Sequence, residues 1–258
     1  MTDERHDPSA WATIKEDPRD GAVCSALAPL LSKDRKMRVT TLRFGEDVQI
    51  HAIDRNWVLV SGNHDDYLGW TNRAHIKEIS VEEECPRVTE KFTVSFAEPD
   101  IKSKAIATLP MGSWITYEET KGEFYSLADI PGYIWRSHTE PKNRYPFEWA
   151  LECLGAPYLW GGGAVDGIDC SGLTQLAYSM TGIAIPRDSD QQEEALDEIS
   201  QDDLRANDLV FWKGHVGMMI SESEIIHATA FAMKTIIEKL EDTIARVGTP
   251  TSYRRVSE

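Results

Sequence analysis

The stretch IDCSGLTQLAY, residues 168–178, places a cysteine at the start of a predicted helix. Apolar residues recur with helical spacing from Leu173 onward, so Asp169 is the predicted N-cap and Cys170 lies in the first turn. The positive end of a helix stabilises an anion, so we expect this thiol to have a lowered pKa. The stretch therefore predicts a nucleophilic cysteine in a domain that begins with helices.

The surroundings of Cys170 fit that interpretation better than a structural role. Residues 157–167, PYLWGGGAVDG, supply glycines that allow the backbone to approach a bound substrate closely. The other cysteines are Cys24, Cys85 and Cys153, and no C-x-x-C pair occurs. We expect free thiols throughout, with these three as small buried hydrophobic residues.

Two histidines could supply the base. His215 begins one apolar strand and His227 ends the next, with the turn-like residues 221–223 between them. In a hairpin, this even separation puts both imidazoles on one face, and a three-residue loop is expected to place them directly opposite each other. One ring can then take the thiol proton while the other orients it. Two alternatives stay open. The histidines could be buried core residues with all their hydrogen bonds made, or they could bind zinc together with Cys170. No second ligand lies near Cys170 at metal-binding spacing.

The 258 residues divide into two kinds of sequence. After an N-terminal segment, residues 1–23, short strand patterns separated by turns fill residues 24–82 and 86–140 as a weak repeat. Residues 143–258 carry two helical patterns and then four strand patterns, which indicates an α+β domain. We therefore predict two small all-β barrels followed by an α+β domain.

Charge limits the partners of the chain. Lys and Arg total 27 against 43 Asp and Glu, a net charge of −16. Such a surface repels phosphate backbones and anionic lipids, so we expect no nucleic acid and no membrane partner. No apolar run is long enough for a transmembrane helix, and the N-terminus lacks the pattern of a signal peptide. We expect a cytoplasmic protein that acts on a small, diffusible substrate.

Six short motifs carry a resemblance to a known family. PYLWGG, DCSGL, PRDS, DLVFW, HVG and HA, in this order across residues 143–258, resemble the NlpC/p60 family of papain-like cysteine peptidases. The resemblance implies Cys170 as nucleophile, His215 as general base, His227 as orienting residue and Tyr158 as an oxyanion-hole donor; a packing role for Tyr158 stays open. It implies no cofactor. The preceding repeats resemble bacterial SH3 domains.

A narrower group within the family has the same domain order. Its members, γ-D-glutamyl-L-diamino acid endopeptidases, release L-Ala-γ-D-Glu from short murein peptides that have a free N-terminal amine. An ammonium requires a carboxylate partner, and the resemblance implies Asp188, with Ser189 beside it, for that role. Alternatively, Ser189 and Gln192 form a capping box, and Asp188 only favours the following helix.

The same resemblance extends the predicted substrate site. Asp169 and Ser171, on either side of the cysteine, are expected to contact substrate. Glu46 and Tyr67 match residues with which the first SH3 domain of the group walls the cleft; ordinary surface and barrel roles remain as alternatives for both.

Two rival functions stay open at this level. One is a secreted hydrolase of intact peptidoglycan, and the other is a catalytically silent protein that binds wall peptides. The choice between diaminopimelate and lysine in the substrate, and the oligomeric state, are also open.

Overall fold

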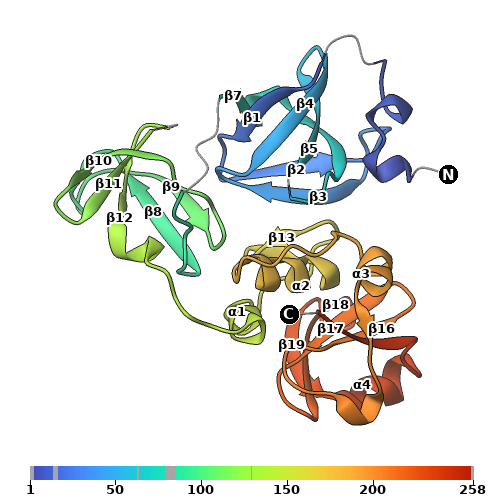
Figure 1. Cartoon of the computed structure of the whole chain (residues 1–258). Coiled ribbons are helices and arrows are strands. Elements are labelled where there is room, and N and C mark those ends of the chain that lie inside the picture. The colour runs from blue at the N-terminus through green and yellow to red at the C-terminus, as the bar shows by residue number, and fades with distance from the viewer. Residues whose placement is uncertain (1–2, 14–16, 63, 80–84, 129, 257–258) are drawn as a thin grey trace. The chain divides into compact units, whose positions relative to one another are not determined.

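The chain divides between Lys142 and Asn143 into two units, Met1–Lys142 and Asn143–Glu258 (Figure 1). The computed structural model describes residues 3–13, 17–62, 64–79, 85–128 and 130–256. The predicted end of the first barrel, residue 82, lies outside the described residues.

The first unit begins with an antiparallel sheet in the order β3-β2-β6-β5-β4-β1-β7. Its strands are β1 (Arg19–Val23), β2 (Leu27–Leu31), β3 (Arg38–Arg43), β4 (Asp47–Asp54), β5 (Trp57–Gly62), β6 (Leu68–Asn72) and β7 (Ile76–Glu78). Short 3-10 turns lie at Glu4–His6, Pro8–Ala10 and Arg73–His75. Every second residue of β4 is buried at its start, which is the alternation expected for a sheet with one covered face.

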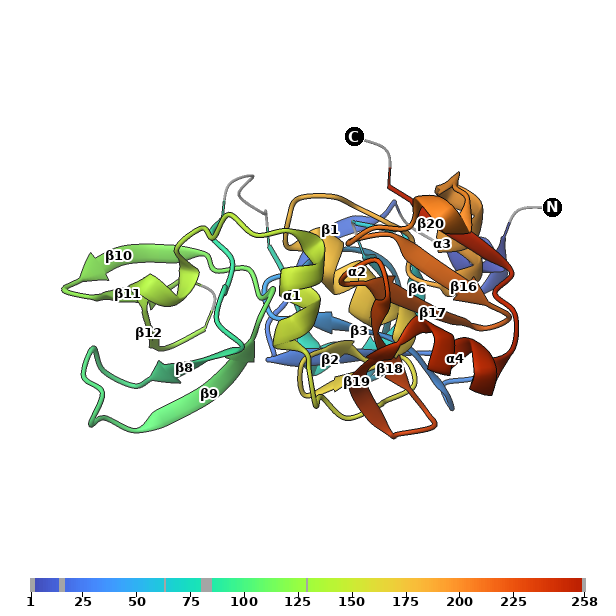
Figure 2. The same cartoon turned by 90° about the horizontal axis from the view of Figure 1, so that it is seen from below.

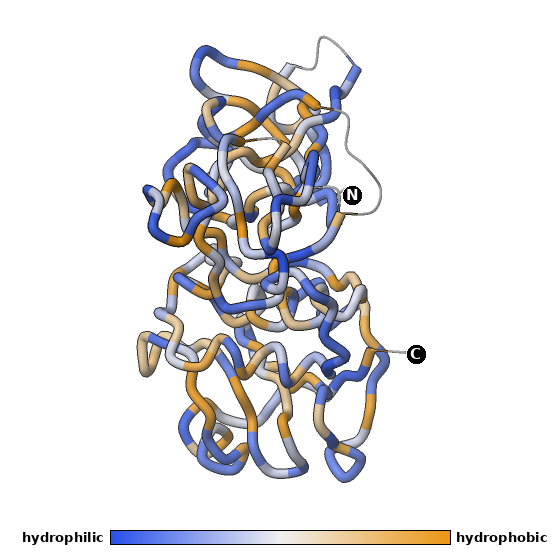
Figure 3. Tube along the Cα trace, turned by 90° about the vertical axis from the view of Figure 1, so that its left-hand side faces the viewer, coloured by the Kyte–Doolittle hydropathy of each residue, from blue (hydrophilic) through white to orange (hydrophobic). Residues whose placement is uncertain are grey.

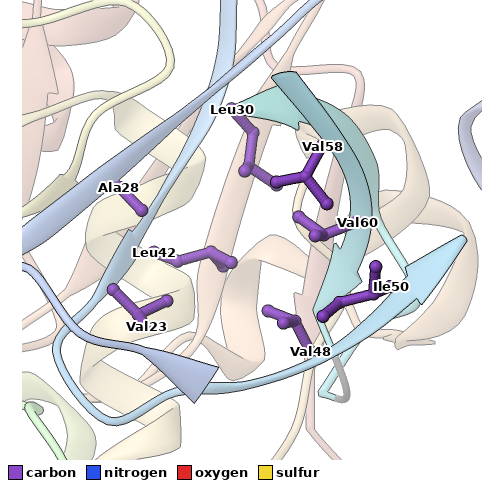
Figure 4. Close-up of a cluster of buried hydrophobic side chains, with 8 residues drawn as sticks. All are labelled: Val23, Ala28, Leu30, Leu42, Val48, Ile50, Val58 and Val60. Carbon is purple, nitrogen blue, oxygen red and sulfur yellow. The ribbon is translucent and has the colours of Figure 1, made fainter. Parts of the chain in front are cut away.

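These alternating residues meet in one core. The cluster draws on β1 to β5 and consists of Val23, Ala28, Leu30, Leu42, Val48, Ile50, Val58 and Val60 (Figure 4). All are aliphatic, and several are β-branched, as is usual for residues packed on a pleated sheet.

The second sheet of this unit has the order β10-β11-β12-β8-β9 and is also antiparallel. Its strands are β8 (Phe92–Phe96), β9 (Ala105–Pro110), β10 (Tyr117–Lys121), β11 (Phe124–Leu127) and β12 (Tyr133–Trp135), with a 3-10 turn at Arg136–Thr139. Its core includes Phe44, a residue from the turn between β3 and β4 of the first sheet. Gly45 follows with φ +75°, and a Cβ there would lie 2.2 Å from the carbonyl oxygen of Trp114. The hydrophobic core of the second sheet therefore includes a residue from the first.

The second unit combines helices with an antiparallel sheet in the order β15-β20-β16-β17-β18-β19 (Figure 2). Its helices are α1 (Pro146–Glu152), α2 (Cys170–Ser179), α3 (Ser189–Ala195) and α4 (Leu240–Val247). The strands of that sheet are β15 (Asp197–Glu198), β16 (Leu209–Trp212), β17 (His215–Met219), β18 (Glu224–Thr229), β19 (Lys234–Lys239) and β20 (Ser252–Arg255). A small hairpin, β13 (Gly163–Ala164) and β14 (Gly167–Ile168), precedes α2, and a 3-10 turn lies at Gln201–Asp203.

The predicted α+β class is confirmed, with antiparallel sheets in the N-terminal unit and helices preceding the main sheet in the other. The four predicted strands correspond to β16–β19, and their apolar residues form part of the core. In both units, hydrophobic stretches run through the interior, and several of the outermost loops are hydrophilic (Figure 3). The helix that follows Asp188 is short, because α3 ends at Ala195 and β15 follows.

Within the described residues, no helix is long and apolar enough to cross a membrane. All four cysteines are described, and all are free thiols. Cys153 is buried as predicted, whereas Cys24 and Cys85 are only half-buried.

Candidate active site

Cys170 is the first residue of α2, and Asp169 is its N-cap, as the sequence predicts. The Asp169 carboxylate accepts a hydrogen bond of 2.7 Å from the backbone N–H of Gly172. The backbone N–H groups of Val216 and Ser171 are close enough to the thiol to favour its ionised form. Since Val216 directly follows His215, the thiol lies near the start of β17.

Arg187 anchors the residues on either side of Cys170. Its side chain is 1% exposed and forms a two-pronged ion pair with Asp169, Nη2 to Oδ2 at 2.7 Å and Nη1 to Oδ1 at 3.0 Å. Nη1 also donates to the Ser171 hydroxyl at 2.9 Å, and the Gly161 N–H donates to Asp169 Oδ2. Asp169 and Ser171 therefore lie in a buried network, and their predicted contact with substrate stays a prediction.

The predicted capping box of Ser189 and Gln192 does not form. Asp188 is the N-cap of α3 and makes no side-chain cap hydrogen bond. Gln192 is instead buried against α2, where it accepts from the Thr174 hydroxyl at 2.8 Å and donates to the Ser171 carbonyl at 3.1 Å. The half-buried Asp188 thus lies where its charge favours α3, as the alternative expects, and its predicted role in amine binding is untested.

His215 and His227 meet as the hairpin predicts, with 2.8 Å between His215 Nε2 and His227 Nδ1. The expectation that they lie directly opposite was wrong. Met218 pairs with Ile226 across a three-residue loop, so the same register puts Gly217 opposite His227 and leaves His215 on the diagonal. A Cβ on Gly217 would lie 3.2 Å from His227 Cβ and 2.5 Å from Ile225 Cδ1. A larger residue at Gly217 would therefore crowd Ile225 and His227 where the hairpin brings the two rings together.

Glu238, on β19, extends the histidine pair and was not singled out in the sequence. Its Oε1 lies 2.8 Å from His227 Nε2. The Thr243 hydroxyl donates to the same oxygen at 2.9 Å, and Arg246 of α4 donates to both carboxylate oxygens. Ile225 pairs with Glu238 and His227 with Ile236, so Glu238 and His227 share one face of the sheet.

Tyr158 is fixed by its backbone close to the cysteine. It bridges to Ile168, two residues before Cys170, and its N–H donates to the Met233 carbonyl at 3.0 Å. Burial raises the pKa of its phenol to about 12, with further increases from Cys170 and Asp169. The phenol therefore stays protonated and is a hydrogen-bond donor near the thiol.

The expected low pKa of the cysteine was wrong. Burial raises the pKa of the Cys170 thiol to about 11, and the Asp169 carboxylate adds to the rise. Desolvation outweighs the helix end and the two N–H donors, because the helix terminus contributes only ~0.3–1 kcal/mol. Burial likewise lowers the pKa of His215 to about 4. At neutral pH the resting site thus holds a thiol and a neutral imidazole.

Titration can test this resting state. We expect no thiolate absorbance from Cys170 near pH 7, measured as the difference between the wild type and Cys170→Ala. Hydrolysis is expected to fall only as the pH drops through about 4, where His215 takes up a proton and can no longer act as a base. A thiolate signal at neutral pH would instead show a preformed thiolate–imidazolium pair.

Glu46 and Tyr67 belong to the N-terminal unit. Glu46 is 2% exposed, and its carboxylate accepts from both the backbone N–H and the guanidinium of Arg43. It is therefore not an ordinary surface glutamate. Tyr67 is buried and makes an edge contact with His6, with 6.0 Å between the ring centroids. Their substrate-binding roles stay predictions.

A first-turn thiol beside two linked imidazoles defines a thiol-dependent hydrolase site. Residues 155–246 match the model of the NlpC/P60 family. These residues form an NlpC/P60 domain, and the chain resembles dipeptidyl-peptidases over most of its length.

Two relatives cover most of the chain. Dipeptidyl-peptidase 6 of Lysinibacillus sphaericus is 26% identical over 232 residues, 79% of this chain and 84% of that protein. A γ-D-glutamyl-L-lysine dipeptidyl-peptidase of Bacillus cereus is 27% identical over 238 residues, 77% of this chain and 69% of that protein. The crystal structure of a Bacillus cereus NlpC/P60 family protein has a TM-score of 0.75 at 20% identity, covering 92% of this chain and 99% of that one. It shows a shared fold.

Proposed function

We propose that this chain is a cysteine peptidase that hydrolyses the amide between γ-D-Glu and the diamino acid of short murein peptides with a free N-terminal L-Ala. The observation that carries the proposal is the Cys170 thiol at the start of β17, beside the linked pair His215 and His227. The resemblance to dipeptidyl-peptidase 6 and to a γ-D-glutamyl-L-lysine dipeptidyl-peptidase supports the substrate class.

In the first half of the reaction, His215 takes the proton of the Cys170 thiol while the sulfur attacks the carbonyl carbon of γ-D-Glu. The negative charge that develops on the carbonyl oxygen is stabilised by hydrogen bonds. The Cys170 N–H belongs to the first turn of α2, whose amides have no partner within the helix, and the Tyr158 hydroxyl is the second donor.

The imidazolium of His215 then donates its proton to the leaving amine of the diamino acid, and the C–N bond breaks. L-Ala-γ-D-Glu remains bound to Cys170 as a thioester. His215 next takes a proton from water, whose oxygen attacks the thioester carbonyl, and the dipeptide leaves as the thiol is restored.

The raised pKa of Cys170 affects how a catalytically silent protein is recognised. A thiol that ionises only as substrate binds reacts slowly with alkylating reagents at neutral pH. Slow alkylation therefore does not indicate a silent binding protein. Only the absence of hydrolysis supports that alternative.

We further propose that the two N-terminal sheets are bacterial SH3 domains and that the enzyme acts in the cytoplasm. The strongly acidic composition supports a small substrate over anionic wall polymers. Fractionation of the producing cells tests the location. Recovery of the protein outside the cytoplasm would favour the rival, a secreted hydrolase of intact peptidoglycan.

Asp188 is the proposed partner of the substrate ammonium. We expect the wild type to cleave L-Ala-γ-D-Glu-L-Lys and L-Ala-γ-D-Glu-meso-diaminopimelate and to leave the N-acetylated peptides intact, read by mass spectrometry. Asp188→Asn is expected to lower kcat/KM for the free peptides about 10- to 100-fold, since a hydrogen bond to a charged group contributes ~1.5–3 kcal/mol.

Asp190→Asn is the matched control, because Asp190 is an exposed aspartate in the first turn of the same helix. It is expected to keep the activity of the wild type. Equal cleavage of free and acetylated peptides would remove the amine pocket from the proposal. Absence of cleavage of either peptide would contradict the proposed function.

A further inference from the structure

The site contains a hydrogen-bonded chain that ends on Glu238. From the base outward, the chain runs from His215 Nε2 to His227 Nδ1 at 2.8 Å, and from His227 Nε2 to Glu238 Oε1 at 2.8 Å. It crosses the neighbouring strands β17, β18 and β19. The peptidase mechanism above gives Glu238 no role, so the role of the carboxylate is open.

The carboxylate determines which nitrogen of His227 carries the proton. An ionised carboxylate has no hydrogen to donate, so the short contact requires a proton on His227 Nε2. A neutral imidazole has a single N–H, so His227 Nδ1 is then an unprotonated acceptor.

The same reasoning continues to His215. Because His227 Nδ1 can only accept, the 2.8 Å contact requires a proton on His215 Nε2. The nitrogen of His215 that keeps a lone pair is then Nδ1. This is the nitrogen that a general base needs in order to take the thiol proton.

Residues of α4 and the preceding segment keep Glu238 ionised and in place. Hydrogen bonds from Arg246 lower the pKa of the Glu238 carboxyl to about 2, with a further contribution from Thr243, against the opposing effect of burial. The Arg246 guanidinium also lies over the exposed ring of Phe231, 4.4 Å from its centroid. The carboxylate is thus anchored by donors on α4 in addition to its contact with His227.

We infer that Glu238 is a positioning residue that fixes the order of protons along His227 and His215 and so leaves His215 Nδ1 as the base toward Cys170. The inference rests on the proposed function only in its catalytic consequence, because the proton order itself is a property of the resting protein.

Glu238 and Arg246 have opposite effects on the pKa values of the two histidines. These two are the charged side chains that affect the pair from β19 and α4: the carboxylate favours the protonated rings and the guanidinium disfavours them. Asp169 and Arg187 act on the thiol. If Glu238 and Arg246 formed only a structural ion pair, the loss of either one would change the histidine pKa values in the same way. If the carboxylate orders the protons, the two losses change these pKa values in opposite directions.

The test compares Glu238→Gln, Arg246→Met and the control Glu241→Gln, a change of the same kind at an exposed glutamate of α4. Nitrogen-15 NMR of the histidine rings in the resting wild type is expected to show protonated Nε2 and unprotonated Nδ1 on both residues. In Glu238→Gln the amide can turn either its oxygen or its NH₂ toward His227, so the signals of a single proton order are expected to be lost. Glu241→Gln is expected to match the wild type.

Titration of the same signals gives the second readout. The histidine pKa values are expected to fall in Glu238→Gln and to rise in Arg246→Met, each by about one unit. Shifts in the same direction, or no shift in either variant, would overturn the inference. So would a proton on Nδ1 of either ring in the wild type.

Kinetics then connect the proton order to catalysis. Glu238→Gln is expected to lower kcat about 10- to 100-fold with KM unchanged, less than the ~10⁴-fold effect of removing the residue that directly orients a catalytic histidine. An unchanged kcat would contradict the positioning role. If the wild type cleaves no murein peptide while its rings show the expected protons, the proposed function fails and the proton order stands.

Discussion

Cys170→Ala is expected to abolish hydrolysis, with kcat lowered about a million-fold, as happens when the nucleophile of a comparable catalytic group is removed. No other group at the site can form the thioester, because His215 and His227 are engaged with each other and the Tyr158 phenol stays protonated. The measurement is release of L-Ala-γ-D-Glu from the free tripeptide, followed by mass spectrometry over hours.

Cys153→Ala is the matched control. Cys153 is also a buried free cysteine of the same unit, and it lies at the end of α1. The change removes the same atom from a similar environment, so a small loss of stability with normal turnover is expected. Comparable activity in Cys170→Ala and the wild type would show that another residue is the nucleophile.

Arg187→Met is expected to lower the free energy of unfolding of the C-terminal unit by ~3–5 kcal/mol, because it leaves the buried Asp169 carboxylate without its ion-pair partner. Denaturant unfolding of the full chain measures the loss. Activity is expected to fall as well, since Arg187 connects Asp169, the Ser171 hydroxyl and the Gly162 carbonyl around the cysteine.

One further variant separates charge from geometry at Arg187, and a second serves as a surface control. Arg187→Lys keeps the charge but not the two-pronged geometry, and we expect an intermediate loss. Arg205→Met removes an exposed arginine from the same unit, and such surface changes usually stay within ~0.5 kcal/mol. If Arg187→Met were as stable as Arg205→Met, the buried ion pair would not be what holds the loop.

The sequence correctly predicted those features that depend on neighbouring residues, namely the helix N-cap and the strands. Asp169 was recognised as an N-cap because its role depends on residues one turn away, and the structure confirms it with a hydrogen bond from the Gly172 N–H. The strands β16–β19 were recognised from their apolar runs. The opposite placement of His215 and His227 failed because a three-residue loop puts Gly217, not His215, across from His227.

Long-range pairing explains what was missed. Arg187 contacts Asp169 from 18 residues away, and nothing in the PRDS motif indicates which carboxylate it meets. Glu238 did carry a signal, a charged residue within an apolar strand, but its alignment with His227 depends on the register of β18 and β19. The pKa of Cys170 could not be predicted because it depends on burial, which sequence position alone does not reveal.

Phe44 also determines which pieces of this protein can exist alone. It belongs by sequence to the first sheet, yet its ring completes the interior of the second, beside Val88 and Ile115. A gene fragment that ends before residue 85 would expose the Phe44 ring to water, at a cost of ~1.5–3 kcal/mol. A fragment that starts at residue 85 would lack Phe44, and its hydrophobic core would contain a cavity. The two sheets are therefore expected to be inherited, duplicated and lost together, as a single unit of recombination.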